Sequence, residues 1–241
     1  MSDITVLISS SPIKSHPSTA IIEETIRSVR FHLPDAPIFI MQDGVRPEQA
    51  DRKDDYELYL RNLRKLNLKN VTIFDAPRFM HQATLTRWVL KSVESPMILF
   101  VEHDTPLVDG PDRPTFIDWP MLKNALMTEQ VNHIRFHYDA EIHPDHQHMM
   151  RGHLTPNLIR CVQWHQRPHL ARTRWYSDLL ARIFTAESVT FIEDKVYSPV
   201  SYSDWDEFKV VIYDPEGTGK NMKRSRDLDG RSGEPKYEMW F

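Results

Sequence analysis

The stretch that decides the fold reads Met97-Ile98-Leu99-Phe100-Val101-Glu102-His103-Asp104. Its five consecutive apolar residues indicate a strand that is buried on both faces, as strands of parallel sheets are. The polar residues that follow lie where open α/β sheets bind ligands, outside the carboxyl ends of the strands. If the extended conformation continues, Glu102 and Asp104 project to the same side and can share one Mg²⁺ or Mn²⁺ ion with phosphate oxygens. The alternative is an acidic turn that binds nothing.

The composition predicts a globular protein without a strong overall charge. Of the 241 residues, 40% are hydrophobic and 27% are charged, which suits one large domain with a substantial core. A net charge of −4 gives no general attraction to nucleic acid or to anionic membranes. The single cysteine, Cys161, excludes an internal disulfide and suits a reducing compartment. With no signal peptide and no apolar run near the roughly 18 residues of a membrane span, we expect a soluble, cytoplasmic protein without integral membrane association.

Two common nucleotide-binding motifs are absent from the sequence. No G-x-G-x-x-G pattern follows the first strand, which argues against a dinucleotide-binding protein. The segment Gly217-Thr218-Gly219-Lys220 resembles a phosphate-binding P-loop only in part, because Asp214 stands where the motif needs glycine. Asn221 stands where the motif needs serine or threonine.

Strands and helices alternate through the first half of the chain. Apolar runs predict strands at 4–8, 38–41, 71–74 and 97–101, and amphipathic segments between them predict three helices: one between Thr19 and Pro34, one at 48–66 and one at 82–93. Such alternation predicts an α/β fold with right-handed crossovers and a parallel, doubly wound sheet. The polar strand ends then meet at one edge of the sheet: Ser9–Ser11, Asp43, Asp75 and Glu102–Asp104.

The second half is less regular. The pattern predicts helices at 119–129 and 172–184 and strands at 131–136, 159–164 and 208–213, whereas 137–158 reads as a histidine-rich loop. The polar, basic tail from 214 onward reads as a mobile loop. We therefore expect a single domain, 1–241, made of an α/β half at 1–110, a second half at 111–213 and the tail at 214–241.

The order of these elements resembles the GT-A fold of nucleotide-sugar glycosyltransferases, particularly the family-2-like group. Carboxylates end the fourth strand, and Glu193-Asp194 follows the apolar pair Phe191-Ile192. The resemblance implies a mostly parallel, Rossmann-like sheet with a less regular acceptor-side half. It also implies that Glu102-His103-Asp104 is the D-x-D element that holds the metal, that Asp43 contacts the nucleoside, and that Asp194, or else Glu193, is the general base.

The chemistry of such a transfer predicts further contacts. A departing diphosphate carries negative charge that a metal ion and basic groups must stabilise. We expect Lys220, Lys223, Arg224, Arg226 and Arg231 to form a basic lid, because flanking glycines allow a gated loop. One carboxylate then deprotonates the acceptor hydroxyl in a single displacement, which inverts the anomeric centre. The residues expected to bind the nucleotide sugar are Ser10, Ser11, Pro12, Asp43, Arg87, Glu102, His103, Lys220 and Arg224.

The acceptor side is predicted from a segment rich in arginine and aromatic residues, 163–175. Trp164 and His165 can stack on sugar rings or bases, and Arg167 can bind phosphate. A glycan or small-molecule acceptor is favoured, and a protein or a modified nucleic-acid base stays open. A different class of function, a metal-dependent hydrolase or nuclease, would use the histidine-rich loop 133–153, where His143, Asp145, His146 and His148 can bind zinc or iron. A non-catalytic sugar-binding or nucleotide-binding module is the third possibility.

Overall fold

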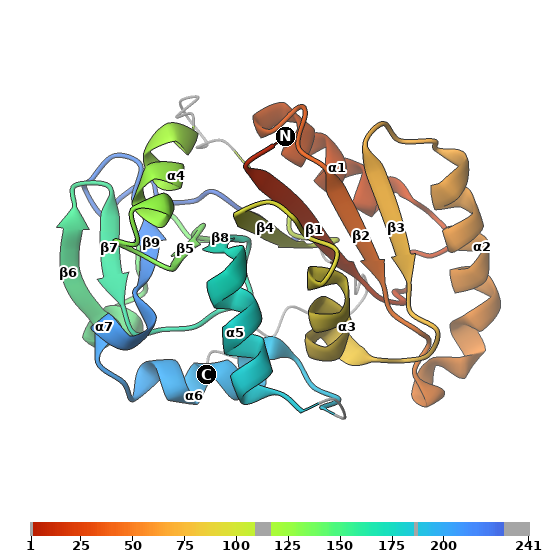
Figure 1. Ribbon diagram of the computed structural model, residues 1–241. Coiled ribbons are helices and arrows are strands. Elements are labelled where there is room, and N and C mark those ends of the chain that lie inside the picture. The colour runs from red at the N-terminus through yellow and green to blue at the C-terminus, as the bar shows by residue number, and fades with distance from the viewer. Residues whose placement is uncertain (1, 109–116, 186–187, 229–241) are drawn as a thin grey trace.

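The computed structural model describes residues 2–108, 117–185 and 188–228, and its centre is one nine-stranded mixed sheet (Figure 1). The strand order is β3-β2-β1-β4-β8-β5-β9-β7-β6. The strands are β1 Ile4–Ser10, β2 Ile38–Gln42, β3 Val71–Asp75, β4 Met97–Glu102, β5 His133–Arg135, β6 Met150–Thr155, β7 Leu158–Cys161, β8 His169–Arg172 and β9 Val210–Tyr213. None of the helices in the described ranges combines the length and apolar character needed to cross a bilayer.

The first half confirms the predicted alternation of strands and helices. Strands β1 to β4 pair in parallel in the order β3-β2-β1-β4, with the helices α1 Ala20–His32, α2 Lys53–Lys65 and α3 His81–Leu90 between them. The predicted helix 48–66 begins as a separate 3₁₀ turn, η1 Pro47–Arg52. Because all four strands point the same way, their carboxyl ends meet at one edge of the sheet.

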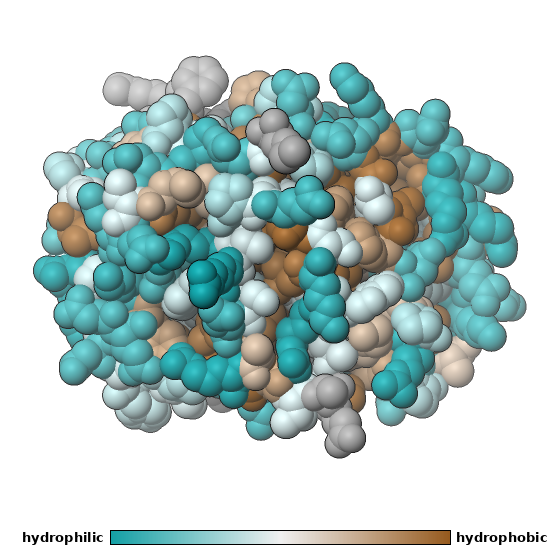
Figure 2. All heavy atoms as spheres, viewed as in Figure 1, coloured by the Kyte–Doolittle hydropathy of each residue, from teal (hydrophilic) through white to brown (hydrophobic). Residues whose placement is uncertain are grey.

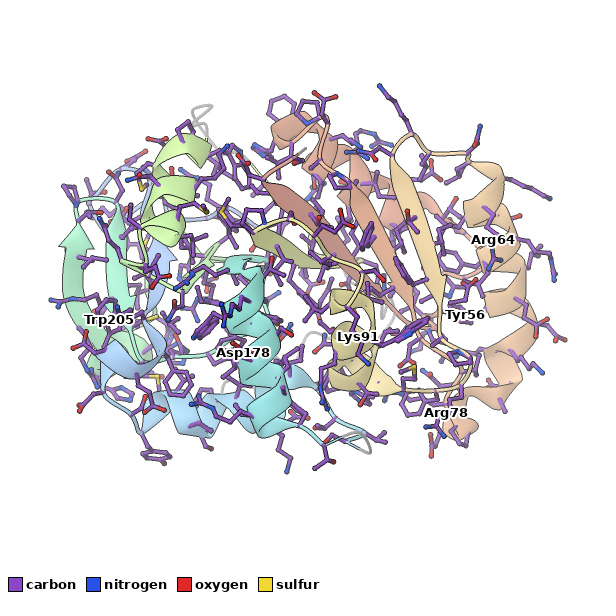
Figure 3. All side chains as sticks on the ribbon, in the orientation of Figure 1. Tyr56, Arg64, Arg78, Lys91, Asp178 and Trp205 are labelled. Atoms are coloured by element: carbon purple, nitrogen blue, oxygen red, sulfur yellow. The ribbon has the colours of Figure 1, made fainter. Side chains whose placement is uncertain are left out.

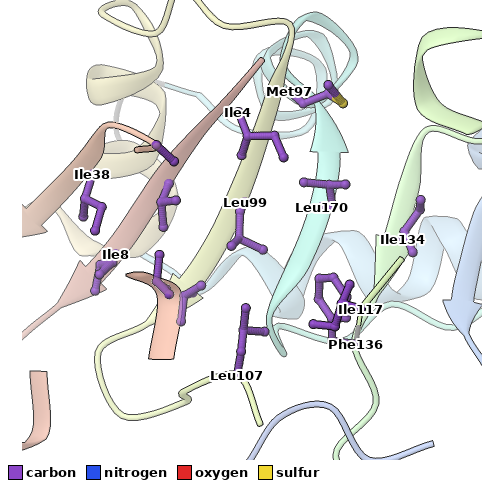
Figure 4. Packing of buried hydrophobic residues seen from close by; sticks show 14 of the residues in the cluster. Ile4, Ile8, Ile38, Met97, Leu99, Leu107, Ile117, Ile134, Phe136 and Leu170 are labelled. Atoms are coloured by element: carbon purple, nitrogen blue, oxygen red, sulfur yellow. The ribbon is translucent and has the colours of Figure 1, made fainter. Parts of the chain in front are cut away.

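Helices cover both faces of the sheet, and the alternation of side chains along the strands explains why. Ile4, Val6 and Ile8 of β1 pack with α1, α2 and α4 Trp119–Met127, whereas Leu7 packs with α3, α5 Thr173–Ile183 and α6 Ile192–Ser201. Figure 4 shows the first of these two cores, where Ile8 and Leu99 gather on one side of the sheet. On the face turned toward the viewer, polar side chains cover both flanks and apolar side chains show near the middle (Figure 2).

The second half corrects three details of the prediction. Residues 169–172 form β8, which lies between β4 and β5 and pairs antiparallel with both, so the sheet is mixed. Residues 150–155, predicted as a loop, form the edge strand β6, and 192–201 form the helix α6. These strands have only four to six residues and are interrupted by histidine, arginine or glycine, so no apolar run or alternation marks them. The remaining small elements are η2 Pro144–Met149 and α7 Trp205–Phe208.

The described part of the tail, 214–228, is not a free loop. Met222, Arg224 and Ser225 are fully buried. Ser225 forms an antiparallel bridge with Leu107, and the backbone N–H of Leu228 donates to the Asp104 carbonyl at 2.8 Å. The tail therefore packs along the segment that follows β4. Arg231, assigned to the lid, lies outside the described residues.

Candidate functional site

A cavity of about 440 Å³ lies at the carboxyl ends of β1, β2 and β4. It is the place that the parallel strand order predicts for a ligand. Seven of the residues predicted from the sequence to bind the donor or the metal line it together: Ser10, Ser11, Pro12, Asp43, Glu102, His103 and Asp104. Residues separated by more than 90 positions thus meet in one site.

Glu102 and Asp104 reach the cavity through a turn rather than through a continued strand. Strand β4 ends at Glu102, and the Thr105 N–H donates to the Glu102 carbonyl at 3.1 Å. The Thr105 hydroxyl accepts a hydrogen bond from the Glu102 N–H, also at 3.1 Å, and locks the turn. The predicted extended geometry is therefore wrong, although both carboxylates still line the same cavity.

The electrostatics of this carboxylate pair suit a cation. Burial, and then the negative charge of Asp104, raise the pKa of Glu102 to about 8. Two carboxylates held close together favour a positive ion between them, and oxygen donors match Mg²⁺ or Mn²⁺. Among the described residues, no group of three or more His, Cys, Asp or Glu side chains is placed to hold a metal ion.

Asp43 joins the end of β2 to the start of α3. Its Oδ1 accepts hydrogen bonds from the N–H groups of Gly44 and Met80, both at 2.8 Å, and its Oδ2 accepts one from His81 at 3.0 Å. Burial raises the pKa of Asp43, and these three N–H groups oppose that shift. Gly44 is required because a Cβ there would lie 2.3 Å from the Phe79 nitrogen. Asp43 therefore shapes the cavity wall that it lines.

Three positive side chains in the cavity were missed by the sequence prediction: Lys14, Arg46 and Arg52. The Arg46 guanidinium lies over the rings of Phe79 and Phe191, 5.3 and 5.8 Å from their centroids. The sequence did contain a signal, because Arg46 lies two residues after Gly44 of the Asp43-Gly44 turn and Lys14 follows the polar end of β1. These cations line the same cavity as Glu102 and Asp104 and can balance the charge of a diphosphate.

A buried hydrogen-bond network supports the floor of the cavity. The Tyr56 hydroxyl, on the face of α2 turned to the sheet (Figure 3), donates to the Asp43 carbonyl at 2.8 Å. The Gln42 amide contacts the hydroxyls of both Tyr56 and Tyr59, at 3.1 and 3.4 Å. The His16 ring stacks on Tyr59 with centroids 3.9 Å apart. Helix α2 thus holds the polar ends of β1 and β2 in place.

Glu193 and Asp194 begin α6 but have different surroundings. Asp194 Oδ2 accepts hydrogen bonds from the Thr190 hydroxyl at 2.8 Å and the Phe191 N–H at 3.3 Å, so this carboxylate caps the helix. Glu193 Oε2 accepts one from the Gln166 N–H at 3.2 Å. The charge of Glu193 also contributes to raising the pKa of Glu102, although Glu193 itself does not line the cavity. Burial raises the pKa of Glu193 itself.

The other residues predicted to bind the donor do not line the cavity. The Arg87 guanidinium donates to the carbonyls of Phe184 and Thr185, at 2.6 and 2.8 Å, and ties α3 to the end of α5. Arg224 is fully buried and donates to the carbonyls of Asn221 and Lys223. Lys220 is exposed in the described tail and does not line the cavity. Packing of the tail against the protein body is the physical reason that Arg224 is withdrawn.

The residues predicted to bind the acceptor differ in their exposure to solvent. Trp164 is fully buried between β5, β8 and α5, 4.5 Å from His133 in ring centroids, and so offers no face to an acceptor. His165 and Arg167 are partly exposed. His165 Nδ1 lies 3.9 Å from Glu193 Oε2, and Arg167 opposes the rise in the pKa of Glu102. Two of the three residues therefore lie on the Glu193 side of the site.

The histidine-rich segment does not form a metal site within the described residues. His133 is buried in the core, stacked on His169 at 4.4 Å. His143 directly precedes the surface turn η2, which carries His146 and His148, and its Nδ1 is 3.5 Å from an Asp145 oxygen. A second cavity beside this turn is lined by Asp139, Glu141, Ile142, His143, Pro144 and Gln147.

No protein-family model and no curated protein matches this sequence. Solved structures match it over nearly its full length, and they have the GT-A fold of glycosyltransferases. One is S. aureus TarS in complex with UDP-GlcNAc, at 13% identity and a TM-score of 0.58, covering 99% of this chain and 61% of that one. Another is GalNAc-T7 with UDP, GalNAc and Mn²⁺, at 13% identity and a TM-score of 0.53, covering 96% of this chain and 45% of that one. The protein therefore has a GT-A-like fold, and it spans about three fifths of the TarS fragment.

Proposed function

We propose that this protein is a glycosyltransferase that moves a sugar from a nucleotide-diphosphate sugar to a hydroxyl acceptor. The observation that carries the proposal is the cavity at the edge of the parallel strands, which is lined both by Glu102 and Asp104 and by Lys14, Arg46 and Arg52. Carboxylates for a metal ion and cations for phosphates are the two kinds of charge that a metal–diphosphate complex needs. Solved structures of the same fold support it, since TarS is in complex with UDP-GlcNAc and GalNAc-T7 is bound to UDP, GalNAc and Mn²⁺.

Glu102 and Asp104 are the residues that would hold Mn²⁺ or Mg²⁺. The bound ion would supply charge neutralisation as the diphosphate departs. Lys14, Arg46 and Arg52, which line the same cavity, bind the phosphate oxygens, and Asp43 with Ser10 and Ser11 orients the nucleoside.

Glu193 is the general base in this proposal, in place of Asp194. The Asp194 carboxylate caps α6, whereas Glu193 accepts a hydrogen bond from the Gln166 N–H and interacts electrostatically with Glu102. Glu193 takes the proton of the acceptor hydroxyl while the hydroxyl oxygen attacks the anomeric carbon and the sugar–phosphate bond breaks. A single displacement of this kind inverts the anomeric centre. The acceptor, which we propose to be a glycan or small molecule, enters beside His165 and Arg167.

A thermal-shift screen tests the proposal. The purified protein is melted with UDP-, GDP-, CMP- and TDP-sugars, each with and without Mn²⁺, and at least one pair should raise the melting temperature only when the metal is present. The shift should disappear in Glu102→Gln and Asp104→Asn. Asp75→Asn is the matched control, because Asp75 also ends a parallel strand but lies outside the cavity. If no nucleotide sugar stabilises the unmodified protein at millimolar concentration, the proposal is wrong.

A further inference from the structure

The side chain of Gln82 bridges the metal site and the helix that carries the proposed base. Gln82 is buried in the first turn of α3. Its Nε2 donates a hydrogen bond to Glu102 Oε1 at 2.8 Å, and its Oε1 accepts one from the Ile192 N–H at 3.2 Å. The Ile192 N–H can only donate, so it fixes the amide oxygen of Gln82 toward α6 and leaves Nε2 to donate to Glu102.

The Ile192 N–H is one of the groups that a helix cannot satisfy from within, because Ile192 is the first residue of α6. Gln82 supplies the missing acceptor from another element of the fold. Glu193 is the next residue, so one amide group connects Glu102 to the backbone beside the base. The start of α3 is itself held by the Asp43 carboxylate, which makes Gln82 a rigid connection.

We propose that Gln82 is a positioning residue, which sets the separation between the Glu102 carboxylate and Glu193 across the reaction centre. It acts through these two groups and takes no part in bond breaking. The proposal rests on the proposed function, in which Glu102 binds the metal and Glu193 accepts the proton. Mutating a residue that orients a metal-binding carboxylate lowers metal affinity or activity by about 10- to 100-fold. Small displacements of reacting groups also have large effects on rate.

A nearby contact provides a matched control. The Thr84 hydroxyl, also on α3, donates to the Ser188 carbonyl at 2.8 Å. This bond ties the same helix to the segment before α6 without touching Glu102 or Ile192. Thr84→Val therefore removes a comparable link between the two elements and leaves the Gln82 bridge in place.

The experiment compares Gln82→Met and Gln82→Glu with Thr84→Val. Gln82→Met keeps the length of the side chain and removes both hydrogen bonds, and Gln82→Glu keeps its shape but places an acceptor against Glu102. Three quantities are measured: the Kd for Mn²⁺ alone by calorimetry, kcat and KM for the donor at saturating Mn²⁺, and hydrogen exchange of the first α6 amides without metal. For Gln82→Met we expect about tenfold weaker Mn²⁺ binding, a similar fall in kcat, a donor KM within about threefold and faster exchange at Ile192. For Gln82→Glu, whose added carboxylate can itself attract the cation, we expect a similar fall in kcat and a changed Kd for Mn²⁺. Thr84→Val should lower the melting temperature and leave the first two quantities unchanged.

Two results would overturn the proposal, and they distinguish failure of the positioning role alone from failure of the proposed function. If the unmodified protein binds Mn²⁺ and transfers sugar, and both Gln82 variants have a Kd and kcat within twofold of it, the positioning role is wrong and the proposed function stands. If the unmodified protein binds neither Mn²⁺ nor any nucleotide sugar, the proposed function fails and the positioning role fails with it. Should Gln82→Met not fold, Gln82→Glu is judged by the same limits.

Discussion

The carboxylate of Asp43 holds the backbone of His81 in an uncommon conformation. His81 has φ of 61°, in the left-handed region, and its N–H donates to Asp43 Oδ2 at 3.0 Å. Such a conformation costs a residue other than glycine about 1–3 kcal/mol unless its surroundings stabilise it. Because α3 begins at His81, the negative charge of Asp43 also lies at the favourable end of that helix. Asp43 therefore affects both the shape of the site, through the His81 backbone, and its charge, through the start of α3.

Asp43→Asn should destabilise the protein by about 1–3 kcal/mol, because the amide presents a donor to N–H groups that need an acceptor. Urea unfolding measures the change, and donor affinity should fall with it, since Asp43 lines the cavity. Asp75→Asn removes only the partly exposed ion pair with Arg64 and should cost about 0–1 kcal/mol. Equal losses in the two variants would contradict the role given to Asp43.

Glu193→Gln and Asp194→Asn should separate catalysis from capping. The first removes the proposed base and should lower kcat by about 10²- to 10⁴-fold with little change in melting temperature. The second removes the acceptor of the Phe191 N–H and should destabilise the protein by about 0.5–2 kcal/mol while kcat stays within a few fold. Steady-state kinetics and thermal unfolding of both variants decide the assignment. Full turnover in Glu193→Gln would exclude Glu193 as the base.

The buried histidines should make the protein sensitive to acid. Burial lowers the pKa of His169 to about 4, and it lowers the pKa of His133 well below its ordinary value. The unfolded chain binds these protons near pH 6.5 and the folded chain does not, so their stabilising contribution is complete above pH 6.5. It is lost as the pH falls toward 4, by up to about 1.4 kcal/mol per pH unit for each histidine.

Urea unfolding at pH 7.5, 6 and 5 measures this dependence. His133→Phe should flatten the slope because the unfolded variant has one proton fewer to gain, whereas the exposed His148→Gln should leave it unchanged. The raised pKa of Glu102 has the opposite effect on stability as the pH falls. This effect is the same in the unmodified protein and in the variants, so it cancels when their pH dependences are compared. An identical slope in His133→Phe would show that His133 is protonated in the folded state.

Trp164→Ala should behave as a core mutation. The side chain is fully buried, and removing it should cost about 3–5 kcal/mol through lost burial and the cavity left behind. Arg167→Gln, at the partly exposed neighbour, should instead raise the acceptor KM with a small change in melting temperature. Thermal unfolding and acceptor kinetics distinguish the two. A stable Trp164→Ala protein with weakened acceptor binding would restore the role predicted from the sequence.

Local patterns were sufficient to predict the first half of the fold. The apolar run before Glu102 and the regular alternation of strands and helices imply parallel strands, and parallel strands end at one edge. This is why Ser10, Asp43 and Glu102 could be assigned to one site without any knowledge of their contacts. In the second half the strands are short and carry histidine or arginine, so periodicity could not show that residues 169–172 lie between β4 and β5.

The sequence by itself therefore determined the α/β class and the acidic edge of the sheet, because both depend on side-chain order along a strand. Only the tertiary structure decided which charged groups meet there. Arg46 and Arg52 line the cavity, whereas Arg224 and Trp164 are buried in the interior. The Asp194 carboxylate caps its own helix, α6. Those outcomes depend on burial and hydrogen bonds between segments far apart in the chain, which no local pattern encodes.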